Sequence, residues 1–356
     1  MHGVAIIGCG QISDLHAAAY SGSDTARIVA LADPDRQGAE AKRQQWGIPE
    51  ATVYTDYRDA LERGDVHIAE ILVPHDLHYE IAAAALAAGK HVSLQKPMTI
   101  SLDQADALLQ AADTAPGLLR VFENFLSYPP VRRAKAIIDS GELGDMQTIV
   151  IRTIAGYSDT AWPPPREPWR FDPSRCGGSP MIFDDGHHYF AMAMYLAGPI
   201  ARVHSSVRHT GGYWTDIPAM VTWEHASGVL GSWIMSYSPG LHIRTQQYPA
   251  NDSVEVTGSN GVLWVTRGHG HLTDLPAVIV AKGRTMDYHD DVEADWALSF
   301  QHASQHFLDA IEASRPAVLS AQDAREVLRV ALAAGQSAQA GTPVDITPSG
   351  WRGITT

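Results

Sequence analysis

The chain has 356 residues, of which 45% are hydrophobic and 19% are charged, and its formal net charge at pH 7 is −14. This length accommodates two domains of ordinary size, and the composition is typical of a soluble globular protein. The negative charge excludes nucleic acid as an expected partner, because it would repel a phosphate backbone rather than neutralise it.

The sequence also bears on the compartment in which the protein works. Cys9 and Cys176 are its two cysteines, too few for a disulfide framework in a chain of this length. A core strand is expected to begin within about four residues of the N-terminus, which leaves no room for a signal peptide, and no apolar run is long enough to span a membrane. We therefore expect a cytoplasmic protein without a membrane partner.

The first element in chain order is an apolar run, Val4–Ile7, that leads directly into Gly8-Cys9-Gly10-Gln11-Ile12-Ser13. A second apolar run, Ile28–Ala32, ends at Asp33. This is the pattern of a buried strand, a glycine turn, a helix N-terminus and a second strand that ends in a carboxylate. The first glycine permits the turn, the second leaves space for a pyrophosphate, and the helix N–H groups point at the anion. Asp33 stands where a carboxylate accepts hydrogen bonds from the adenosine ribose.

This motif predicts a dinucleotide site that includes Gly8, Gly10, Gln11, Ile12 and Asp33. Because Asp33 would repel a 2′-phosphate, the expected cofactor is NAD, with NADP less favoured, although Arg36 nearby weakens that distinction. Ser13 stands where a glycine or an alanine usually permits close packing of helix on strand, and serine is only slightly larger. The alternative is a tight turn in a parallel sheet that binds nothing.

Up to residue 122 the sequence alternates apolar strands with amphipathic helices, as in a parallel sheet with helices on both faces. The expected strands are Val4–Ile7, Ile28–Ala32, Thr52–Tyr54, Ile68–Val73, His91–Leu94 and Leu118–Phe122. Helices are expected at Leu77–Ala88, after a capping box formed by Ser101 and Gln104, and at Val131–Ser140.

The second part of the sequence has consecutive strands joined by short turns, which predicts an antiparallel sheet. The expected strands are Met146–Thr153, Ile200–Arg208, Ala219–His225, Gly228–Ser236, Ser253–Thr257, Val262–Thr266 and Ala277–Ala281. Two helices, Asp295–Ala313 and Ala321–Gln339, close the chain. We predict an α/β protein with a Rossmann dinucleotide-binding domain, residues 1–122, and an α+β domain with a large, mainly antiparallel sheet, residues 123–356.

A broad antiparallel sheet has one face covered by helices and a second face that needs a cover. Alternating apolar residues, among them Val221, Trp223, Leu230 and Ile234, provide at least one apolar face. We therefore expect the protein to associate with copies of itself through this sheet.

Ligands of open parallel sheets lie beyond the carboxyl ends of the strands, so the residues after each strand are informative. Pro74, His75 and His78 follow the fourth strand, Gln95 and Lys96 the fifth, and Asn124 the sixth, and all are expected near the cofactor. Lys96, next to Pro97, would lie beside the nicotinamide. Partial burial and the positive charge of the oxidised ring would there favour proton exchange or a hydrogen bond with a substrate hydroxyl. The alternative is a surface lysine.

A second group of polar residues, Asp184-Asp185-Gly186-His187-His188, precedes an apolar helix, Tyr189–Ala197. Asp184 and His188 are four residues apart, which on a helix places them on one face. A carboxylate beside a histidine fixes its tautomer and stabilises the imidazolium, as a general base for a hydroxyl proton requires. The alternative is a capping or helix-terminal charge. Asp185 and His187 are expected to be structural.

Two further sets of residues bear on ligand binding. Tyr157, Trp162, Trp169 and Arg170 lie in a loop-rich stretch and are candidates for the wall of a carbohydrate site, although core packing explains a single tryptophan equally well. The histidine pairs His269/His271 and His302/His306 lack a carboxylate or cysteine at a supporting spacing, so no metal site is expected.

Several separated motifs resemble those of the Gfo/Idh/MocA family, which takes its name from glucose–fructose oxidoreductase, inositol dehydrogenase and a rhizopine catabolism protein. They are the glycine turn, Ala87-Ala88-Gly89-Lys90-His91-Val92 before Gln95-Lys96-Pro97, Gly141-Glu142-Leu143-Gly144, and the Asp184–Gly186–His188 spacing. The resemblance runs nearly end to end. It implies that Lys96 matches the lysine of a Glu-Lys-Pro motif and that Asp184 and His188 match a catalytic pair. It also implies a homodimer or homotetramer formed through the C-terminal sheet.

The chain departs from the family pattern at two positions. Gln95 replaces the usual glutamate, so we expect the Lys96 ammonium to lose a stabilising carboxylate neighbour. His75 stands where an asparagine is common. Both departures leave the cofactor contacts less well defined and the proton-transfer residues intact.

The function expected from the sequence is hydride transfer between NAD(P) and a secondary alcohol carbon of a sugar, glycoside or cyclitol. His188, oriented by Asp184, would take the hydroxyl proton while Lys96 hydrogen-bonds the same oxygen. The aromatic loop favours a sugar or glycoside over a cyclitol. Two alternatives stay open: an enzyme that retains NAD and oxidises a sugar transiently to permit elimination or hydrolysis, and a non-catalytic dinucleotide-binding regulator.

Overall fold

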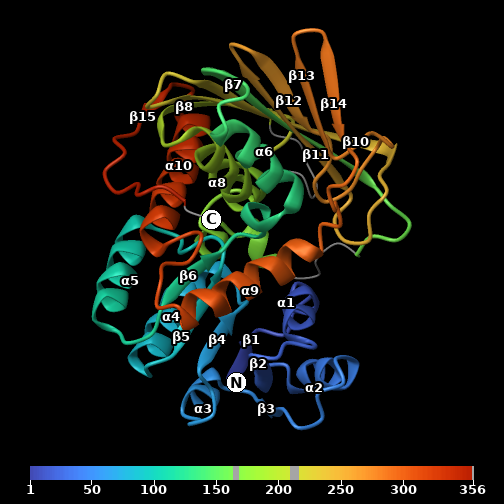
Figure 1. The fold of residues 1–356 in the computed structure, drawn as a ribbon. Coiled ribbons are helices and arrows are strands. Elements are labelled where there is room, and N and C mark those ends of the chain that lie inside the picture. Colours follow the sequence, from blue (N-terminus) through green and yellow to red (C-terminus); the bar gives the residue numbers. More distant parts are fainter. Residues whose placement is uncertain (163–167, 209–215, 355–356) are drawn as a thin grey trace.

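The computed structural model describes residues 1–162, 168–208 and 216–354, which form two sheets with helices packed around them (Figure 1). The first sheet has six parallel strands in the order β3-β2-β1-β4-β5-β6. The second sheet has nine strands in the order β14-β13-β12-β11-β7-β10-β9-β8-β15. The predicted fold class, a Rossmann-type parallel sheet followed by a large, mainly antiparallel sheet, is confirmed.

All the strands predicted before residue 122 are present, with ends that differ by at most two residues. They are β1 (His2–Ile7), β2 (Ala26–Ala32), β3 (Thr52–Tyr54), β4 (Ile68–Ile71), β5 (His91–Gln95) and β6 (Leu119–Phe122). The helices of this part are α1 (Ser13–Tyr20), α2 (Arg36–Gln45), α3 (Tyr57–Leu61), α4 (His78–Ala87), α5 (Leu102–Thr114) and α6 (Pro129–Asp139), with short turns η1 (His75–Leu77) and η2 (Asn124–Ser127). Because helices cover both faces of the sheet, successive residues of the central strand β1 are buried, as Val4, Ala5 and Ile6 show.

The second sheet is mixed: β10 and β7 pair in parallel, whereas all the other neighbouring strands of this sheet pair antiparallel. Its strands are β7 (Met146–Tyr157), β8 (Ile200–Val207), β9 (Ala219–His225), β10 (Leu230–His242), β11 (Ala250–Gly258), β12 (Gly261–Val265), β13 (Val278–Lys282), β14 (Thr285–His289) and β15 (Val344–Asp345). The edge strands β14 and β15 were not predicted. β14 is exposed along nearly its whole length and β15 has two residues, so neither has a buried alternation to read.

The helices of the second part are η3 (Pro168–Phe171), α7 (Pro173–Cys176), η4 (Pro180–Asp185), α8 (Gly186–Ala197), α9 (Leu298–Glu312) and α10 (Ala321–Ala340). Helices α6, α8 and α10 lie between the large sheet and the first sheet (Figure 1). Helix α9 returns to the first part of the chain and packs against α1. None of the described helices is long and apolar enough to cross a membrane.

The apolar residues expected on one face of the large sheet divide between its two faces. The antiparallel register pairs Trp233 with Val221 and Leu230 with Glu224. Trp233 and Val221 face α8 and are fully buried, whereas Leu230 faces the other side and is 57% exposed. The alternation was read correctly, but the relative register of two strands is not visible in either strand alone.

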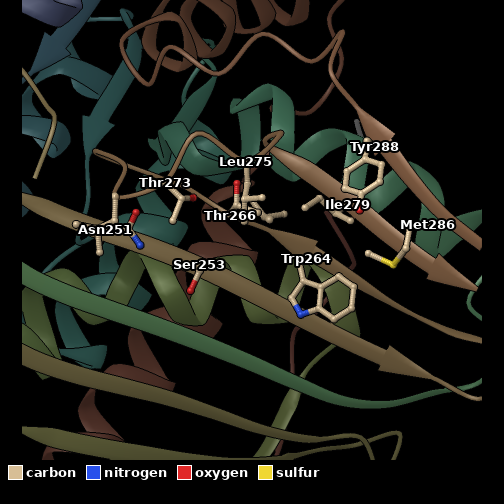
Figure 2. Close-up of a pocket in the computed structure, with 11 residues that line it drawn as sticks. Asn251, Ser253, Trp264, Thr266, Thr273, Leu275, Ile279, Met286 and Tyr288 are labelled. Atoms are coloured by element: carbon tan, nitrogen blue, oxygen red, sulfur yellow. The ribbon is translucent and has the colours of Figure 1, made fainter.

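The face of the large sheet opposite the helices carries several exposed apolar side chains. It carries a hollow of about 500 Å³ lined mainly by β11–β14, with Trp264, Ile279, Met286 and Tyr288 among its side chains (Figure 2). Met286 and Tyr288 are about half exposed. This hollow is remote from the carboxyl ends of the parallel strands, where the polar groups described below converge.

A buried polar cluster lies inside the first sheet and centres on Glu70 of β4. Its carboxylate accepts hydrogen bonds from the Tyr20 hydroxyl and from Oγ of Ser93, the latter at 2.8 Å, and lies 2.8 Å from Nδ1 of His16. Arg120 donates from Nε to Oγ of Ser93 at 2.9 Å, and its guanidinium is 3.9 Å from Glu70. The cluster ties α1 to strands β4, β5 and β6.

Replacing Glu70 by glutamine should destabilise the fold by about 3 kcal/mol at neutral pH, because it leaves the buried Arg120 guanidinium without its carboxylate. Burial by itself would raise the pKa of Glu70, but the charge and hydrogen bond of His16, with Arg120 and Tyr20, lower it overall. A carboxylate with a lowered pKa stabilises the fold at neutral pH and loses that effect as the pH falls through its folded pKa.

The free energy of unfolding in urea should therefore differ between the wild type and Glu70→Gln at neutral pH, and this difference should become smaller in acid. Glu80→Gln is the matched control, since that carboxylate also bonds a tyrosine and an arginine but is 56% exposed. If Glu70→Gln lowers the free energy of unfolding no more than Glu80→Gln does, the Glu70 cluster contributes little to the stability of the fold.

Candidate active site

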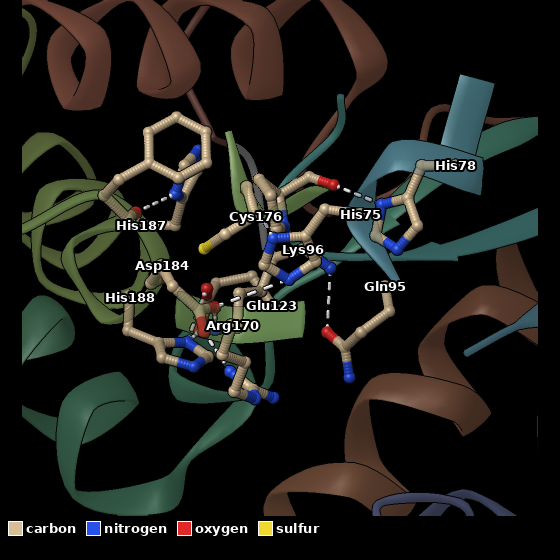
Figure 3. A network of polar contacts seen from close by, with 12 residues as sticks. His75, His78, Gln95, Lys96, Glu123, Arg170, Cys176, Asp184, His187 and His188 are labelled. Carbon is tan, nitrogen blue, oxygen red and sulfur yellow. Dashed lines mark hydrogen bonds and ion pairs between the residues drawn. The ribbon is translucent and has the colours of Figure 1, made fainter. Parts of the chain in front are cut away.

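Charged side chains from both halves of the chain meet beyond the carboxyl ends of the parallel strands (Figure 3). Lys96 follows β5 and Glu123 follows β6, while Arg170 lies in η3, Asp184 in η4 and His188 in α8. The predicted Lys96, Asp184 and His188 are thus brought into one region, although they come from segments far apart in the sequence.

The glycine turn has the geometry that a dinucleotide requires. Gly8 has φ +94°, and a Cβ there would lie 2.5 Å from the carbonyl oxygen of Leu72, so this glycine is needed by the fold. A Cβ at Gly10 would meet no protein atom within 4 Å, so the backbone there faces open space that a pyrophosphate would occupy. Ser13 is buried without conflict, because its hydroxyl donates to the Gly10 carbonyl.

Asp33 is held next to this turn by two backbone amides. Its Oδ2 accepts from the N–H of Cys9 at 2.7 Å and its Oδ1 from the N–H of Asp35 at 2.8 Å. Each carboxylate oxygen keeps a further lone pair, which fits acceptance of ribose hydroxyls. Arg36, whose side chain is 61% exposed, lies 3.9 Å from Glu40.

Lys96 forms a buried ion pair with Asp184. Its ammonium donates to Oδ1 of Asp184 at 2.7 Å and to the Asp184 backbone carbonyl at 3.1 Å. The neutral Gln95 supplies no carboxylate here, as expected from the sequence, and the carboxylate beside the ammonium comes from the second half of the chain. Gln95 instead accepts from the Lys96 backbone N–H at 2.8 Å and donates to Nε2 of His16 at 3.1 Å.

Asp184 is surrounded by positive and polar groups. Besides Lys96, its carboxylate is paired with Arg170, and Nε2 of His75 lies 3.5 Å from Oδ1. Burial alone would raise the pKa of Asp184, but Arg170, Lys96 and His75 hold it well below its ordinary value. Asp184 is therefore an ionised anchor for two cations.

The carboxylate that contacts His188 is Glu123. Nδ1 of His188 lies 2.7 and 2.8 Å from the two oxygens of Glu123. The expected orientation of His188 by Asp184 is wrong, because Asp184 lies in a π-helical turn that ends at Asp185 and α8 begins only at Gly186. Across that change of helical period, a spacing of four residues no longer places two side chains on one face.

The segment that carries Asp184 is held by two sets of contacts. Gly177, with φ +95°, and Gly178 leave room for the ring of Phe183, since a Cβ on either would lie within 2.8 Å of it. Asp216 accepts hydrogen bonds from the N–H groups of Met181 and Ile182, at the first turn of η4. Neither Asp216 nor Glu123 was singled out from the sequence, because each acts on a segment distant in the chain.

Some residues predicted to contact the cofactor have other partners. His78 is fully buried with its ring nitrogens 2.6 Å from the Pro97 carbonyl and 3.0 Å from the Val73 carbonyl, and burial lowers its pKa to about 4. Asn124 is buried and donates to Oγ of Ser299 at 2.9 Å. The structure thus assigns these two side chains to packing between elements.

The remaining strand-end residues lie at the site. Pro74 precedes η1 and is partly exposed. His75 is buried with Nδ1 2.8 Å from the Cys176 carbonyl, and burial lowers its pKa well below the ordinary value, so it is neutral. Gln11 and Ile12 of the glycine turn are partly exposed.

The expected substrate wall is formed only in part. The Trp169 ring lies edge-on to His75 at 4.6 Å and under the guanidinium of Arg170 at 4.7 Å, so both loop residues reach the site. Trp162 packs edge-on against Tyr248 at 5.4 Å. Tyr157 instead contacts His242 and is 45% exposed.

Asp185 and His187 behave differently from each other. His187 is buried with Nδ1 2.5 Å from the Phe183 carbonyl, and burial lowers its pKa to about 3, as fits a structural residue. Asp185 is partly exposed; burial raises its pKa, and Lys96, His188 and His269 are close enough to oppose that rise. Within the described ranges, no group of three or more His, Cys, Asp or Glu is arranged to hold a metal ion.

A parallel sheet with a dinucleotide turn, joined to a large sheet that supplies a second set of polar groups, defines a two-part nucleotide-dependent oxidoreductase. The family model described as "Oxidoreductase family, NAD-binding Rossmann fold" matches residues 2–123, and the "GFO/IDH/MocA C-terminal domain" matches residues 131–264. The chain belongs to the Gfo/Idh/MocA family of oxidoreductases. The recognition made from the motifs is confirmed, as is a cofactor of the NAD type.

The chain is similar to several dehydrogenases. It is 26% identical over 355 residues to scyllo-inositol 2-dehydrogenase (NAD(+)) of Bacillus subtilis, covering 96% of this chain and 95% of that protein. It is 29% identical over 214 residues to levoglucosan dehydrogenase of Pseudarthrobacter phenanthrenivorans, covering 57% of this chain and 53% of the relative. A solved levoglucosan dehydrogenase in complex with NADH superposes with a TM-score of 0.80 at 21% identity, covering 97% of this chain and 99% of the other.

The two glycines of the turn should respond differently to alanine. Gly10→Ala should fold as the wild type, because the added methyl group meets no protein atom. It should bind NADH at least tenfold more weakly, because the methyl group would keep the pyrophosphate away from the backbone N–H groups. One lost hydrogen bond to a charged group costs about 1.5–3 kcal/mol. Gly8→Ala should lower the free energy of unfolding by about 1–3 kcal/mol, because of its φ and the contact with Leu72. Calorimetric titration with NADH and urea unfolding separate the two effects. Equal NADH affinity of Gly10→Ala and the wild type would contradict the assignment.

Proposed function

We propose that this protein is an NAD-dependent dehydrogenase that oxidises a secondary alcohol of a sugar or glycoside. The observation that carries the proposal is the meeting of the Lys96–Asp184 and His188–Glu123 pairs from the two halves of the chain. The dinucleotide would be held by the Gly8–Ile12 turn and Asp33, with Pro74, His75 and Gln95 near its nicotinamide end. When bound, it supplies the hydride acceptor.

His188 is suited to take the hydroxyl proton. Glu123, itself buried, accepts a hydrogen bond from Nδ1–H and leaves Nε2 as the basic nitrogen of the neutral ring. After proton transfer the same carboxylate stabilises the imidazolium. His188 would thus be the general base and Glu123 the residue that positions it.

Lys96 is suited to hydrogen-bond the oxygen of the reacting alcohol. Its ammonium has three donors, of which two are directed to Asp184, so one remains for a substrate. Asp184 and Arg170 fix its position, which supports a role in orienting the carbinol for hydride transfer.

The nature of the substrate is supported by two observations. Trp169 presents an aromatic ring beside His75, and aromatic rings pack against the apolar faces of sugars. The relatives named above act, by their names, on levoglucosan and scyllo-inositol, and the former is an anhydrosugar. The carboxylate of Asp33, which is held beside the glycine turn, favours NAD over NADP because it would repel a 2′-phosphate.

We further propose that copies of the chain associate through the open face of the large sheet and that the protein works in the cytoplasm. The exposed apolar side chains Met220, Leu230, Met286 and Tyr288 support the first proposal, since apolar area of this kind is usually covered. The two free, buried cysteines support a reducing compartment.

Lys96→Ala should abolish turnover while NADH binding stays measurable, with a loss of kcat/KM on the order of 10²- to 10⁴-fold. Absorbance of NADH is followed across a panel of sugars, anhydrosugars, glycosides and cyclitols, and binding is followed by calorimetry. Retained turnover would overturn the assignment of Lys96. Product formed by the wild type without net NADH would favour transient oxidation with a retained cofactor.

Glu123→Gln should lower kcat by roughly 10²-fold at neutral pH and leave the affinity for NADH unchanged, because the amide does not stabilise the imidazolium. Glu142→Gln, which removes an exposed ion pair with Lys282, is the control. If the acid limb of the pH–rate profile and kcat are the same in both variants, Glu123 does not act through His188.

A further inference from the structure

A second imidazole–carboxylate pair, His269 with Asp252, lies close to His188. Nδ1 of His269 is 2.6 Å from Oδ2 of Asp252, and the His269 backbone N–H donates to the same oxygen at 3.1 Å. The side chain of His269 is 9% exposed and that of Asp252 is 3% exposed. This histidine belonged to a pair weighed as a metal ligand, and the proposed hydride transfer assigns it no role.

Asp252 is fully satisfied by protein groups. Its other oxygen accepts from the Tyr189 hydroxyl at 2.6 Å and from Oγ1 of Thr153 at 3.0 Å. Burial alone would raise the pKa of Asp252, but the charge and hydrogen bonds of His269, with Tyr189, lower it overall. A carboxylate held in this way fixes the His269 ring with its Nδ1 edge directed at Asp252. The Nε2 edge therefore points away from Asp252, and no hydrogen-bond partner for it is found among the described residues.

Both imidazoles pack on the same aromatic ring. Phe125 is edge-on to His188 at 5.3 Å and to His269 at 5.2 Å, and the two imidazole centroids are 6.4 Å apart. Trp296 and Tyr248 complete the surroundings of His269, with ring centroids at 4.6 and 5.5 Å. His269 is thus held rigidly next to His188.

A charged group of the site, the Asp185 carboxyl, also lies near His269. Asp185, partly exposed in the same region, interacts with Lys96, His188 and His269. A rigid imidazole at this position has a nitrogen available to a neutral polar ligand, and a hydroxyl pairs with imidazole in either protonation state because it both donates and accepts.

We infer that His269, positioned by Asp252, binds a second hydroxyl of the substrate, so that the enzyme selects polyols over analogues lacking that hydroxyl. This inference rests on the proposed dehydrogenase function. It adds that the substrate carries, besides the reacting hydroxyl, a second hydroxyl placed to meet the imidazole next to the proposed base. A site that bonds a hydroxyl rejects the deoxy analogue, because the site's own polar group is then left unpaired.

The test compares variants at His269 on the best substrate of the panel and on each of its monodeoxy analogues. His269→Phe keeps an aromatic ring against Trp296 and removes both ring nitrogens, including Nε2. It should raise KM for the parent polyol roughly tenfold or more, with kcat changed much less. For one deoxy analogue, KM should be the same in His269→Phe as in the wild type. His269→Gln, which places an amide near the position of Nε2, should recover part of the affinity.

Two controls make the result decisive. His271→Phe alters a partly exposed histidine two residues away and should leave KM unchanged. Calorimetric affinity for NADH should be equal in all variants. If His269→Phe raises KM for every analogue by the same factor, or weakens NADH binding, His269 is structural and the inference fails while the proposed function stands. A wild type that oxidises no member of the panel overturns both.

Discussion

The buried ion pair between Lys96 and Asp184 is the contact on which the arrangement of the site depends. Both charges lie out of water, where an unpaired ion is strongly unfavourable, so each requires the other for the fold to keep them there. One partner stands at the end of a parallel strand and the other in a helical turn of the second half. Arg170 adds a second cation from the loop that precedes this turn.

Two imidazole–carboxylate pairs extend this arrangement on the side of the second sheet. His188 is paired with Glu123 and His269 with Asp252, and both imidazole rings pack on Phe125. In both pairs the carboxylate comes from a strand or a strand end, and such rigid elements fix an imidazole more closely than loops do. The polar groups of the site are thereby oriented before any ligand binds.

The interior of the first sheet supports the strand that carries Lys96. Glu70 is linked through His16 to Gln95, and Gln95 accepts a hydrogen bond from the Lys96 backbone. His16 belongs to α1, the helix that begins at the dinucleotide turn. A network of buried and partly buried hydrogen bonds therefore joins α1, the helix that follows the turn, to the Lys96 backbone.

The sequence by itself determined the dinucleotide turn and the strands of the first sheet, and it singled out Lys96, Asp184 and His188 as candidates, because each is encoded in a short contiguous motif. It left the edge strands, the register between β9 and β10, and the partner of each charged residue undetermined. Only the tertiary structure decided that Glu123 contacts His188 across 65 residues and that Asp184 contacts Lys96 across 88. The reason is physical: local patterns fix turns and periodicity, whereas the pairing of buried charges depends on which segments the packed core brings together.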